Sequence, residues 1–299
     1  MISAQLLGKL TKSEIAFKQN VCLSDRSTFR IGGECAVGIF PSSEEQLAIA
    51  VSLLDRENVR THICGRGSNT LFADGRLEIA VIFTSQVDGV SINGESISCG
   101  AGAGLVAVSN VACNAGLTGM EFASGIPGSM GGAVFMNAGA YGSSMENVVV
   151  NTRAYDRSTG NITVITDNRF GYRQSVYKSN AQLLCLGAEL RLKKGNTEQI
   201  RAEMRELSEQ RRKKQPLEFA SAGSYFKRPE GDFAGRLIEI CGLKGTRIGG
   251  AEVSDKHAGF IINRNNATFD DVLRLEEVVK ETVMKQTGIA LEREVEVIK

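Results

Sequence analysis

The chain has 299 residues, of which 42% are hydrophobic and 23% are charged, and its formal net charge is +1. This composition is typical of an ordinary soluble globular protein and excludes the fibrous and disordered classes. A charge so close to zero gives no reason to expect bulk attraction to nucleic acid or to an anionic membrane. At this length, two or three domains with cores of their own are expected.

The N-terminal stretch MISAQLLGKLTKSEIAF has only a short apolar run, which Lys9 and Lys12 interrupt. That pattern fits neither the apolar region of a secretory signal nor a membrane-spanning helix. We therefore expect a cytoplasmic protein that does not bind membranes.

Cysteine and histidine usage argues against a structural or catalytic metal. The seven cysteines are widely spaced and never form a C-x-x-C pair, and there are only two histidines. Disulfide frameworks and zinc sites need closer, paired spacings. The sequence thus predicts no metal site, and the cysteines are interpreted as small buried hydrophobic residues.

The first two thirds of the chain predict strands with a few helices. Residues 40–74 indicate a strand, a helix with Ser42 or Ser43 at its start, a second strand and a glycine-rich turn. Short strands are expected up to residue 104 and a small-residue helix over 105–115. Alternating patterns over 148–192 predict further strands.

The last third predicts helices alternating with strands. Residues 196–214 have a capping Asn or Thr, an acidic first turn and a cationic end, which is the pattern of a helix. A turn, a helix, a strand, a long amphipathic helix and a terminal strand are expected after it. The fold class is α+β, with expected domains at residues 1–85, 86–193 and 194–299, and with the option that the last strand returns to the first domain.

Two glycine-rich stretches suggest close approach of the backbone to a ligand. Gly65–Asn69 combines spaced glycines with an Arg, a Ser and an Asn, which suits a nest of amide donors for a pyrophosphate. Gly119–Gly142 contains seven of the 33 glycines and almost no charge. Apolar residues are interleaved with these glycines, so the stretch is not a flexible linker.

These stretches, GRGSNTLF and GIPGSMGGA followed by NAGAYG, resemble the flavin-binding domain of the vanillyl-alcohol-oxidase-type FAD proteins. The later runs FGYRQSVYK, SAGSYFKRP, AGRLIEICGLKG, KHAGFIIN and LEREVEVI are similar to those of the UDP-N-acetylenolpyruvoylglucosamine reductase family (MurB). The resemblance extends from Thr28 to Ile298. It implies two FAD-binding subdomains followed by a substrate domain.

The resemblance implies that both glycine-rich stretches contact FAD. The implied cofactor-binding residues are Gly65, Arg66, Gly67, Ser68, Asn69, Thr70, Gly125, Ile126, Pro127, Gly128, Ser129, Gly132 and Ala133.

Three residues are candidates for catalysis: Arg173, Ser224 and Glu294. A guanidinium among aromatic residues suits a carboxylate, although a lone Arg more often forms a surface ion pair. Ser224 lies in a tight turn where most serines are structural, yet proton donation needs only a hydroxyl within reach. Glu294 alternates with Glu292 and Glu296, and periodicity alone does not separate Glu294 from Glu292.

The substrate-binding candidates are mostly basic: Tyr172, Arg211, Lys214, Lys227, Arg228 and His257. The cations after residue 210 complement the end of a helix, and contact with a diphosphate is the alternative role for them. The chain resembles the shorter branch of the family, which lacks a tyrosine-bearing loop and has FKRP in place of FKNP. A tyrosine lid is therefore not carried over to this sequence.

The resemblance implies an NADPH-dependent flavoenzyme of peptidoglycan synthesis that converts UDP-N-acetylglucosamine enolpyruvate to UDP-N-acetylmuramate. Reduced FAD would pass hydride to the terminal vinyl carbon, Arg173 would hold the carboxylate, and Ser224 would supply the proton. Glu294 is expected to be protonated or paired with Arg173. The alternatives are another FAD-dependent oxidase of the same fold and a non-catalytic nucleotide-sugar binder. Oligomeric state is left open, with a monomer favoured.

Overall fold

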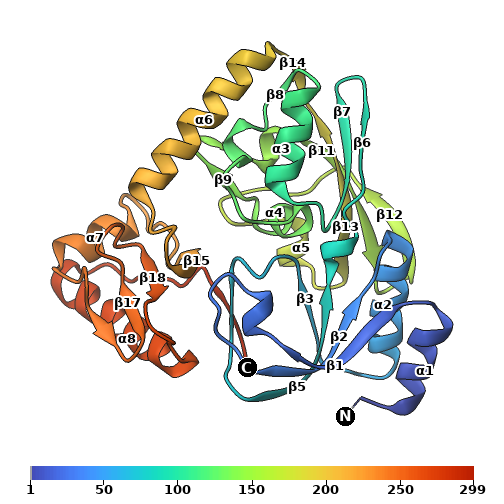
Figure 1. Cartoon of the computed structure of the whole chain (residues 1–299), viewed down its shortest axis with the longest axis horizontal. Helices are drawn as coiled ribbons and strands as arrows, with labels where there is room; N and C mark the ends of the chain where they lie inside the picture. The colour runs from blue at the N-terminus through green and yellow to red at the C-terminus, as the bar shows by residue number, and fades with distance from the viewer. Residues whose placement is uncertain (1) are drawn as a thin grey trace. The chain divides into compact units, whose positions relative to one another are not determined.

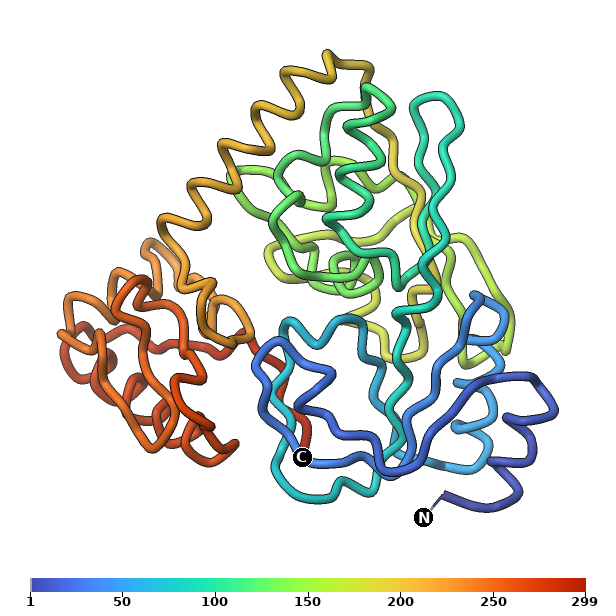
Figure 2. The backbone as a smooth tube through the Cα atoms, in the orientation of Figure 1, coloured from blue at the N-terminus to red at the C-terminus, as the bar shows by residue number. Residues whose placement is uncertain are grey.

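The computed structural model describes residues 2–299, which form two compact units (Figures 1 and 2). Unit 1 comprises Ala36–Arg66, Glu78–Gln210 and the described part of Met1–Gln19. Unit 2 comprises Asn20–Cys35, Gly67–Leu77 and Arg211–Lys299. Helices and strands occur in both units, which confirms the α+β class. The three-part division at residues 85 and 193 stays a prediction.

One sheet has the strand order β1-β2-β5-β3, and β3 runs parallel to β5. Its strands are β1 (Ala16–Cys22), β2 (Glu34–Phe40), β5 (Arg76–Phe83) and β3 (Thr61–Cys64). Helices α1 (Ala4–Lys12) and α2 (Glu44–Arg56) lie beside it (Figure 1). Leu10, Leu47 and Ile82 belong to the shared core. The side chain of Ser43 caps α2 by accepting from the amide of Gln46, as the sequence predicted.

The second sheet of unit 1 is antiparallel throughout, in the order β12-β11-β13-β7-β6. Its strands are β6 (Val90–Asn93), β7 (Ser96–Gly100), β11 (Val149–Asp156), β12 (Asn161–Ile165) and β13 (Leu183–Arg191). The helices of this region are α3 (Leu105–Asn114), α4 (Met130–Met136) and α5 (Val176–Ser179), and short strands are β8 (Leu117–Thr118), β9 (Gly139–Ala140), β10 (Ser143–Ser144) and β14 (Lys193–Lys194). Their buried apolar side chains form one core with this sheet.

Helix α6 (Thr197–Lys214) is the most polar helix of the chain, and Ile200 is its one buried residue. The side chain of Asn196 accepts hydrogen bonds from the amides of Glu198 and Gln199. This cap explains where the helix begins. Four consecutive cations, Arg211–Lys214, occupy its last turn, where they complement the helix dipole.

Unit 2 contains an antiparallel sheet in the order β15-β18-β17-β16. Its strands are β15 (Ala220–Ser224), β16 (Arg247–Ile248), β17 (Ala251–Val253) and β18 (Phe260–Asn263), and its helices are α7 (Ala234–Ile240) and α8 (Phe269–Thr287). The last strand, β19 (Glu296–Ile298), runs parallel to β4 (Thr70–Phe72). Phe29, Leu71, Leu237 and Val272 share the core of this unit.

The structure differs from the sequence-based expectations in a few places. The glycine-rich stretch contains the helix α4, and α1 and α5 were not expected. Gly131 and Gly132 make α4 a poor helix by propensity, so burial of Met130 and Val134 must supply its stability. The terminal strand is shorter than predicted, because β19 begins only at Glu296. Among residues 2–299, no helix is both long and apolar enough to cross a membrane.

Gly8 provides a test of helix propensity in α1. It is exposed, and a Cβ added to it would meet nothing within 4 Å. Gly8→Ala is therefore expected to raise the free energy of unfolding by about 0.5–1 kcal/mol, since Ala loses less backbone entropy on folding. Urea unfolding followed by circular dichroism measures this change. An unchanged or lower free energy of unfolding would contradict it.

His62, in β3, is expected to make stability depend on pH. Burial lowers its pKa to about 4 from an ordinary 6.5. The unfolded chain binds more protons between these values, so folded stability falls as the pH decreases from 6.5 towards 4. The unfolding free energy of the wild type should fall by roughly 3 kcal/mol more than that of His62→Gln over this pH range. Unfolding of both proteins at several pH values measures this difference. Parallel curves for the two proteins would refute this assignment.

Candidate active site

In unit 1, the Gly65–Arg66 turn directly follows β3 and packs against the residues that precede α3 and α4. A Cβ on Gly65 would overlap the hydroxyl of Ser129. A Cβ on Gly104 would lie 3.0 Å from Cζ of Arg66. The absence of side chains at Gly65 and Gly104 thus lets this turn approach the starts of both helices.

The starts of α3 and α4 lie side by side. Gly104 and Ser129, the residues that precede them, form an antiparallel bridge, and the amide of Leu105 donates to the carbonyl of Gly128 at 3.0 Å. Gly104 has no side chain that could cap α3, and the Ser129 side chain forms no cap hydrogen bond with α4. Two helix N-termini beside the Arg66 guanidinium make an electropositive cradle built largely from backbone, which suits a pyrophosphate.

The glycine-rich stretch is also tied to the strand end that precedes α3. The amide of Gly131 donates to the carbonyl of Ala101 at 2.8 Å, and a Cβ on Gly131 would lie 2.9 Å from that of Ala101. Gly131 was not among the predicted cofactor-binding residues, whereas its neighbour Gly132 was. The sequence pattern alone does not distinguish the two glycines. Gly132 and Pro127 are exposed, while Ser129 and Ala133 are buried.

The second half of the predicted flavin turn, Gly67–Thr70, belongs to unit 2. The amide of Thr28 donates to the carbonyl of Gly67 at 3.2 Å. The side-chain amide of Asn69 donates to the carbonyl of Glu294 at 3.2 Å, and the amide of Glu296 donates to the carbonyl of Asn69 at 2.9 Å. Asn69 therefore fixes the backbone on both sides of Val295, a contact that sequence reasoning did not foresee.

The carboxyl end of the glycine-rich stretch holds the turn that carries Arg173. Asn137 donates its side-chain amide to the carbonyl of Gly171 at 3.0 Å, and the Ser175 hydroxyl donates to the carbonyl of Phe135 at 2.8 Å. Lys178 donates to the carbonyl of Arg173 at 3.1 Å. These three hydrogen bonds hold the turn that carries Arg173.

Arg173 itself adopts a left-handed backbone conformation, with φ of 54°. Residues other than glycine rarely adopt it, and such strain persists only where the surroundings enforce it. Cζ of Arg173 lies 5.3 Å from the centre of the Tyr172 ring, and Tyr172 is exposed. The turn presents a partly buried guanidinium with an aromatic neighbour.

In unit 2, Ser224 and Glu294 lie on two segments that pair with each other. Phe226 and Arg293 form an antiparallel bridge. The amide of Glu294 donates to the carbonyl of Tyr225 at 2.8 Å, and the amide of Lys227 donates to the carbonyl of Glu292 at 2.8 Å. The structure therefore brings the chain at Ser224 and the chain at Glu294 together, and the Ser224 residue is exposed.

The side chain of Glu292 is occupied by another group. Its carboxylate forms an ion pair with Lys227 at 2.7 Å, which lowers the pKa of Glu292. Periodicity alone left Glu292 and Glu294 equivalent, and the assignment of Glu294 to catalysis stays a prediction. It also gives Lys227, a predicted substrate-binding residue, a partner within unit 2.

The remaining substrate-binding candidates of unit 2 lie around α7 and at the end of α6. Cζ of Arg228 stacks 4.4 Å from the centre of the Phe233 ring. Nδ1 of His257 accepts the amide of Gly259 at 3.1 Å, so the proton of the neutral ring lies on Nε2, which remains a donor. Burial lowers the pKa of His257. Arg211 is partly buried and Lys214 is exposed.

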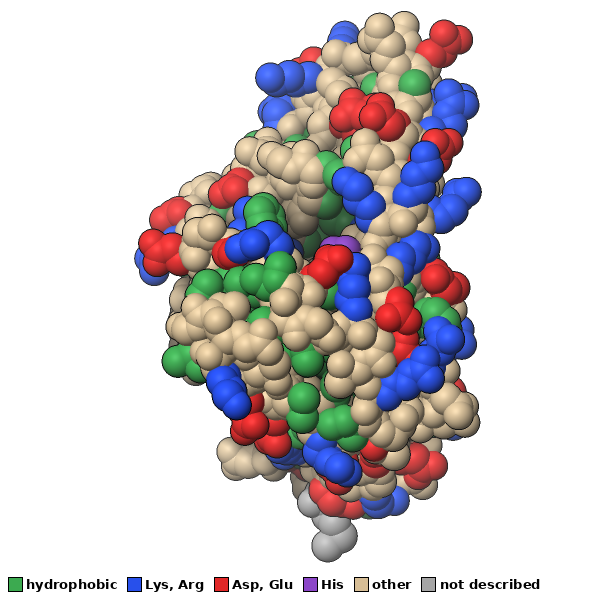
Figure 3. Space-filling view, turned by 90° about the vertical axis from the view of Figure 1, so that its left-hand side faces the viewer, with side chains coloured by type: hydrophobic (Ala, Val, Ile, Leu, Met, Phe, Trp, Pro, Cys, Tyr) green, Lys and Arg blue, Asp and Glu red, His purple; other side chains and the backbone are tan. Residues whose placement is uncertain are grey.

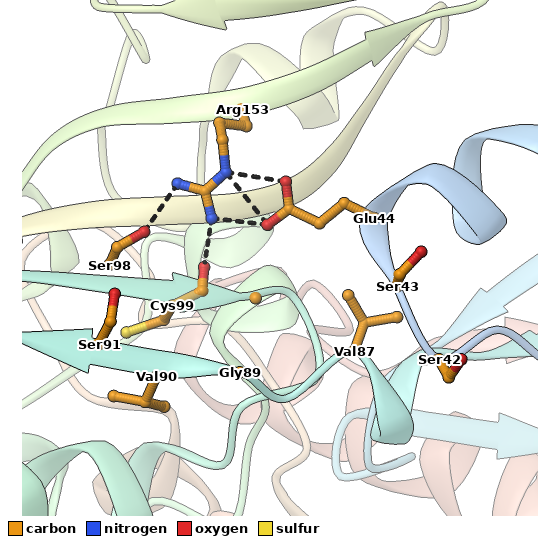
Figure 4. A pocket seen from close by; sticks show the side chains of 11 residues that line it. Ser42, Ser43, Glu44, Val87, Gly89, Val90, Ser91, Ser98, Cys99 and Arg153 are labelled. Atoms are coloured by element: carbon orange, nitrogen blue, oxygen red, sulfur yellow. Dashed lines mark hydrogen bonds and ion pairs between the residues drawn. The ribbon is translucent and has the colours of Figure 1, made fainter.

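A separate hollow of about 390 Å³ lies in unit 1 and contains none of the predicted site residues (Figure 4). Arg153 dominates it and binds both carboxylate oxygens of Glu44, at 2.6 and 2.8 Å, with further bonds to the Ser98 hydroxyl and the Cys99 carbonyl. With its donors engaged in this way, Arg153 joins the start of α2 to the second sheet. We interpret this hollow as structural.

Possible metal ligands and surface charge were also located. Within 2–299, no group of three or more histidine, cysteine or acidic side chains is placed to hold a metal ion. On the face drawn in Figure 3, basic side chains lie among acidic ones.

Two protein-family models match different parts of the chain. Residues 36–166 match the model of an FAD binding domain, and residues 215–298 match that of the UDP-N-acetylenolpyruvoylglucosamine reductase C-terminal domain. The reductase of Caldanaerobacter subterraneus is 42% identical over 93% of this chain and 92% of its own length. That of Clostridium novyi is 40% identical over 99% and 96%.

A solved structure agrees with these matches. The crystal structure of UDP-N-acetylenolpyruvylglucosamine reductase (MurB) from Thermus caldophilus superposes with a TM-score of 0.82 at 31% identity, covering 95% of this chain and 100% of that one. The chain therefore belongs to the UDP-N-acetylenolpyruvoylglucosamine reductase family and is an FAD-containing oxidoreductase with an FAD-binding domain of the vanillyl-alcohol-oxidase type.

Proposed function

We propose that the chain is a cytoplasmic NADPH-dependent reductase that converts the enolpyruvyl group of UDP-N-acetylglucosamine enolpyruvate to the lactyl group of UDP-N-acetylmuramate. The observation that carries the proposal is the backbone pairing that holds Ser224 and Glu294 on neighbouring segments of unit 2. Family membership supplies the substrate class, and this pairing supplies a hydroxyl and a carboxyl group for it. FAD, when bound, supplies the hydride.

The cradle of unit 1 fits the pyrophosphate of FAD. Gly65 and Gly104 leave no room for side chains, and the starts of α3 and α4 face this region without side-chain caps. Arg66 adds a fixed positive charge. We assign the diphosphate of FAD to these groups and to the amides of the Gly125–Ser129 loop.

Arg173 is assigned to the substrate carboxylate. Reduction of the enolpyruvyl double bond places negative charge towards the carbon next to this carboxylate, and a fixed guanidinium stabilises such charge without having to reorganise. The strained φ and the bonds from Asn137 and Lys178 supply that fixity. Tyr172, beside Arg173, is proposed to contact the substrate.

Ser224 is assigned as the proton donor, and Glu294 is assigned as a further catalytic residue. A serine hydroxyl is a weak acid, but the carbon that it protonates is very basic, so a positioned hydroxyl suffices. Glu294 is proposed to be protonated or paired with Arg173 when substrate binds, because an unpaired carboxylate would repel the developing charge. Arg211, Lys214, Lys227, Arg228 and His257 are proposed to bind the diphosphate and its surroundings.

Anaerobic addition of NADPH to the purified protein tests the function directly. The yellow protein is expected to bleach, and addition of the enolpyruvyl substrate is expected to restore the colour. Recovery only on exposure to oxygen would favour an FAD-dependent oxidase. A protein that neither retains FAD nor binds added FAD would favour a non-catalytic binder of nucleotide sugars.

Gly65→Ala tests the cradle. The added Cβ collides with Ser129, and overpacking of this kind typically costs about 1–3 kcal/mol, so the purified variant should retain less FAD per chain. Flavin absorbance relative to protein measures this. Gly89→Ala is the matched control, because a Cβ there meets nothing within 4 Å. Equal FAD content in both variants would exclude the assigned packing.

Ser224→Ala tests the proton donor. The variant should still be bleached by NADPH, whereas its return to the yellow form with the enolpyruvyl substrate should slow by roughly two orders of magnitude or more, the usual contribution of a positioned acid. Stopped-flow absorbance separates the two half-reactions. Ser221→Ala, on the same strand, should leave both rates near normal. Normal turnover of Ser224→Ala would refute the assignment.

A further inference from the structure

A buried carboxylate lies behind the paired segments that carry Ser224 and Glu294. Glu276, in the middle of α8, is 3% exposed. Its Oε2 accepts the Tyr225 hydroxyl at 2.8 Å and Nη1 of Arg293 at 2.9 Å, and its Oε1 accepts Nζ of Lys280 at 2.6 Å. All four residues belong to unit 2.

The two partners on Oε2 are the chain neighbours of the candidate catalytic residues. Tyr225 directly follows Ser224, and Arg293 directly precedes Glu294. Tyr225 is 1% exposed and packs edge to face against Phe226 with ring centres 5.1 Å apart. Oε2 of Glu276 thus binds one side chain from each segment, that of Tyr225 and that of Arg293.

Burying a carboxylate is costly, and an apolar residue at this point of α8 would stabilise the core at least as well. Burial raises the pKa of Glu276, but the hydrogen bonds from Lys280 and Tyr225 and the charge of Arg293 outweigh it, so the pKa lies below its usual value. Glu276 is therefore ionised at neutral pH. Burial and the Glu276 charge raise the pKa of Tyr225, which stays a neutral donor.

Apart from the bonds to Glu276, the two segments are joined by a short backbone pairing and by the exposed Lys227–Glu292 ion pair, and exposed ion pairs contribute little. The pairing consists of one isolated bridge with two flanking hydrogen bonds, because β15 ends at Ser224 and β19 begins only at Glu296. Such a short ladder fixes relative position less firmly than a full strand pair does. The side-chain bonds to Glu276 add a constraint that crosses from one segment to the other.

We propose that Glu276 is a positioning residue for this reaction, which sets Ser224 and Glu294 relative to each other by binding Tyr225 and Arg293 to one carboxylate. The inference rests on the proposed function. Glu276 touches neither substrate nor cofactor in this assignment, and it acts through the placement of the proton donor. Its loss should therefore affect the half-reaction that consumes the enolpyruvyl substrate and spare the half-reaction with NADPH.

The test uses the FAD-loaded protein and four variants, one of which combines Glu276→Gln with Tyr225→Phe. Glu276→Gln keeps the shape of the side chain and removes its charge, Tyr225→Phe removes one donor, and Glu277→Gln is a matched control because Glu277 is exposed on the same helix. Both half-reactions are followed by stopped-flow absorbance, and thermal unfolding is measured for each protein.

Glu276→Gln is expected to slow flavin reoxidation by the enolpyruvyl substrate roughly ten- to a hundredfold, the effect of a misplacement of about 1 Å at a reacting group. Flavin reduction by NADPH should change by less than about twofold, and kcat should fall more than KM rises. Tyr225→Phe should act in the same direction, and the double variant should lose less than the sum of the two, as expected for one coupled network.

Equal loss in both half-reactions, or loss only of thermal stability, would overturn the inference and leave Glu276 a structural residue. An unchanged reoxidation rate in Glu276→Gln would overturn it as well. Where Glu276→Gln does not fold, Tyr225→Phe carries the same test. A wild-type flavin that the substrate does not reoxidise would refute the proposed function itself, and with it this inference. A wild type that is reoxidised and variants that match it would refute the inference alone.

Discussion

Close approach of backbone to backbone is the constraint on which unit 1 depends. The Gly65–Arg66 turn reaches the starts of α3 and α4 because Gly65 and Gly104 have no side chains, which would meet Ser129 and Arg66. The missing side chains allow this close packing, and hydrogen bonds such as that from the Gly131 amide to the Ala101 carbonyl stabilise it. A side chain at Gly65 or Gly104 would push the Gly65–Arg66 turn away from the two helix N-termini that form the cradle.

The glycine-rich stretch Gly119–Gly142 contacts both the cradle and the turn that carries Arg173. At its amino end it lines the cradle, and at its carboxyl end Asn137 and the Phe135 carbonyl hold the turn of Arg173. The helix α4 connects these two ends as a short rigid element. A shift of α4 would therefore move the Gly125–Ser129 loop and the turn of Arg173 together.

How much of this the sequence predicted depends on whether the signal was local. Caps such as Ser43 and Asn196, and the amphipathic pattern of α8, lie within one element and predicted it well. The helix α4 was missed because its stability comes from tertiary burial and its propensity is poor. The contact between Glu292 and Lys227 could not be predicted, because it joins residues that are 65 positions apart in the chain.

The parallel pairing of β19 with β4 has a consequence for how the protein folds. Thr70 pairs with Glu296, and Asn69 hydrogen-bonds to the backbone on both sides of Val295. These partners are separated by more than two hundred residues. Because such distant pairing is slow and forms late in folding, the Gly67–Thr70 turn reaches its final backbone conformation only in the last steps of folding.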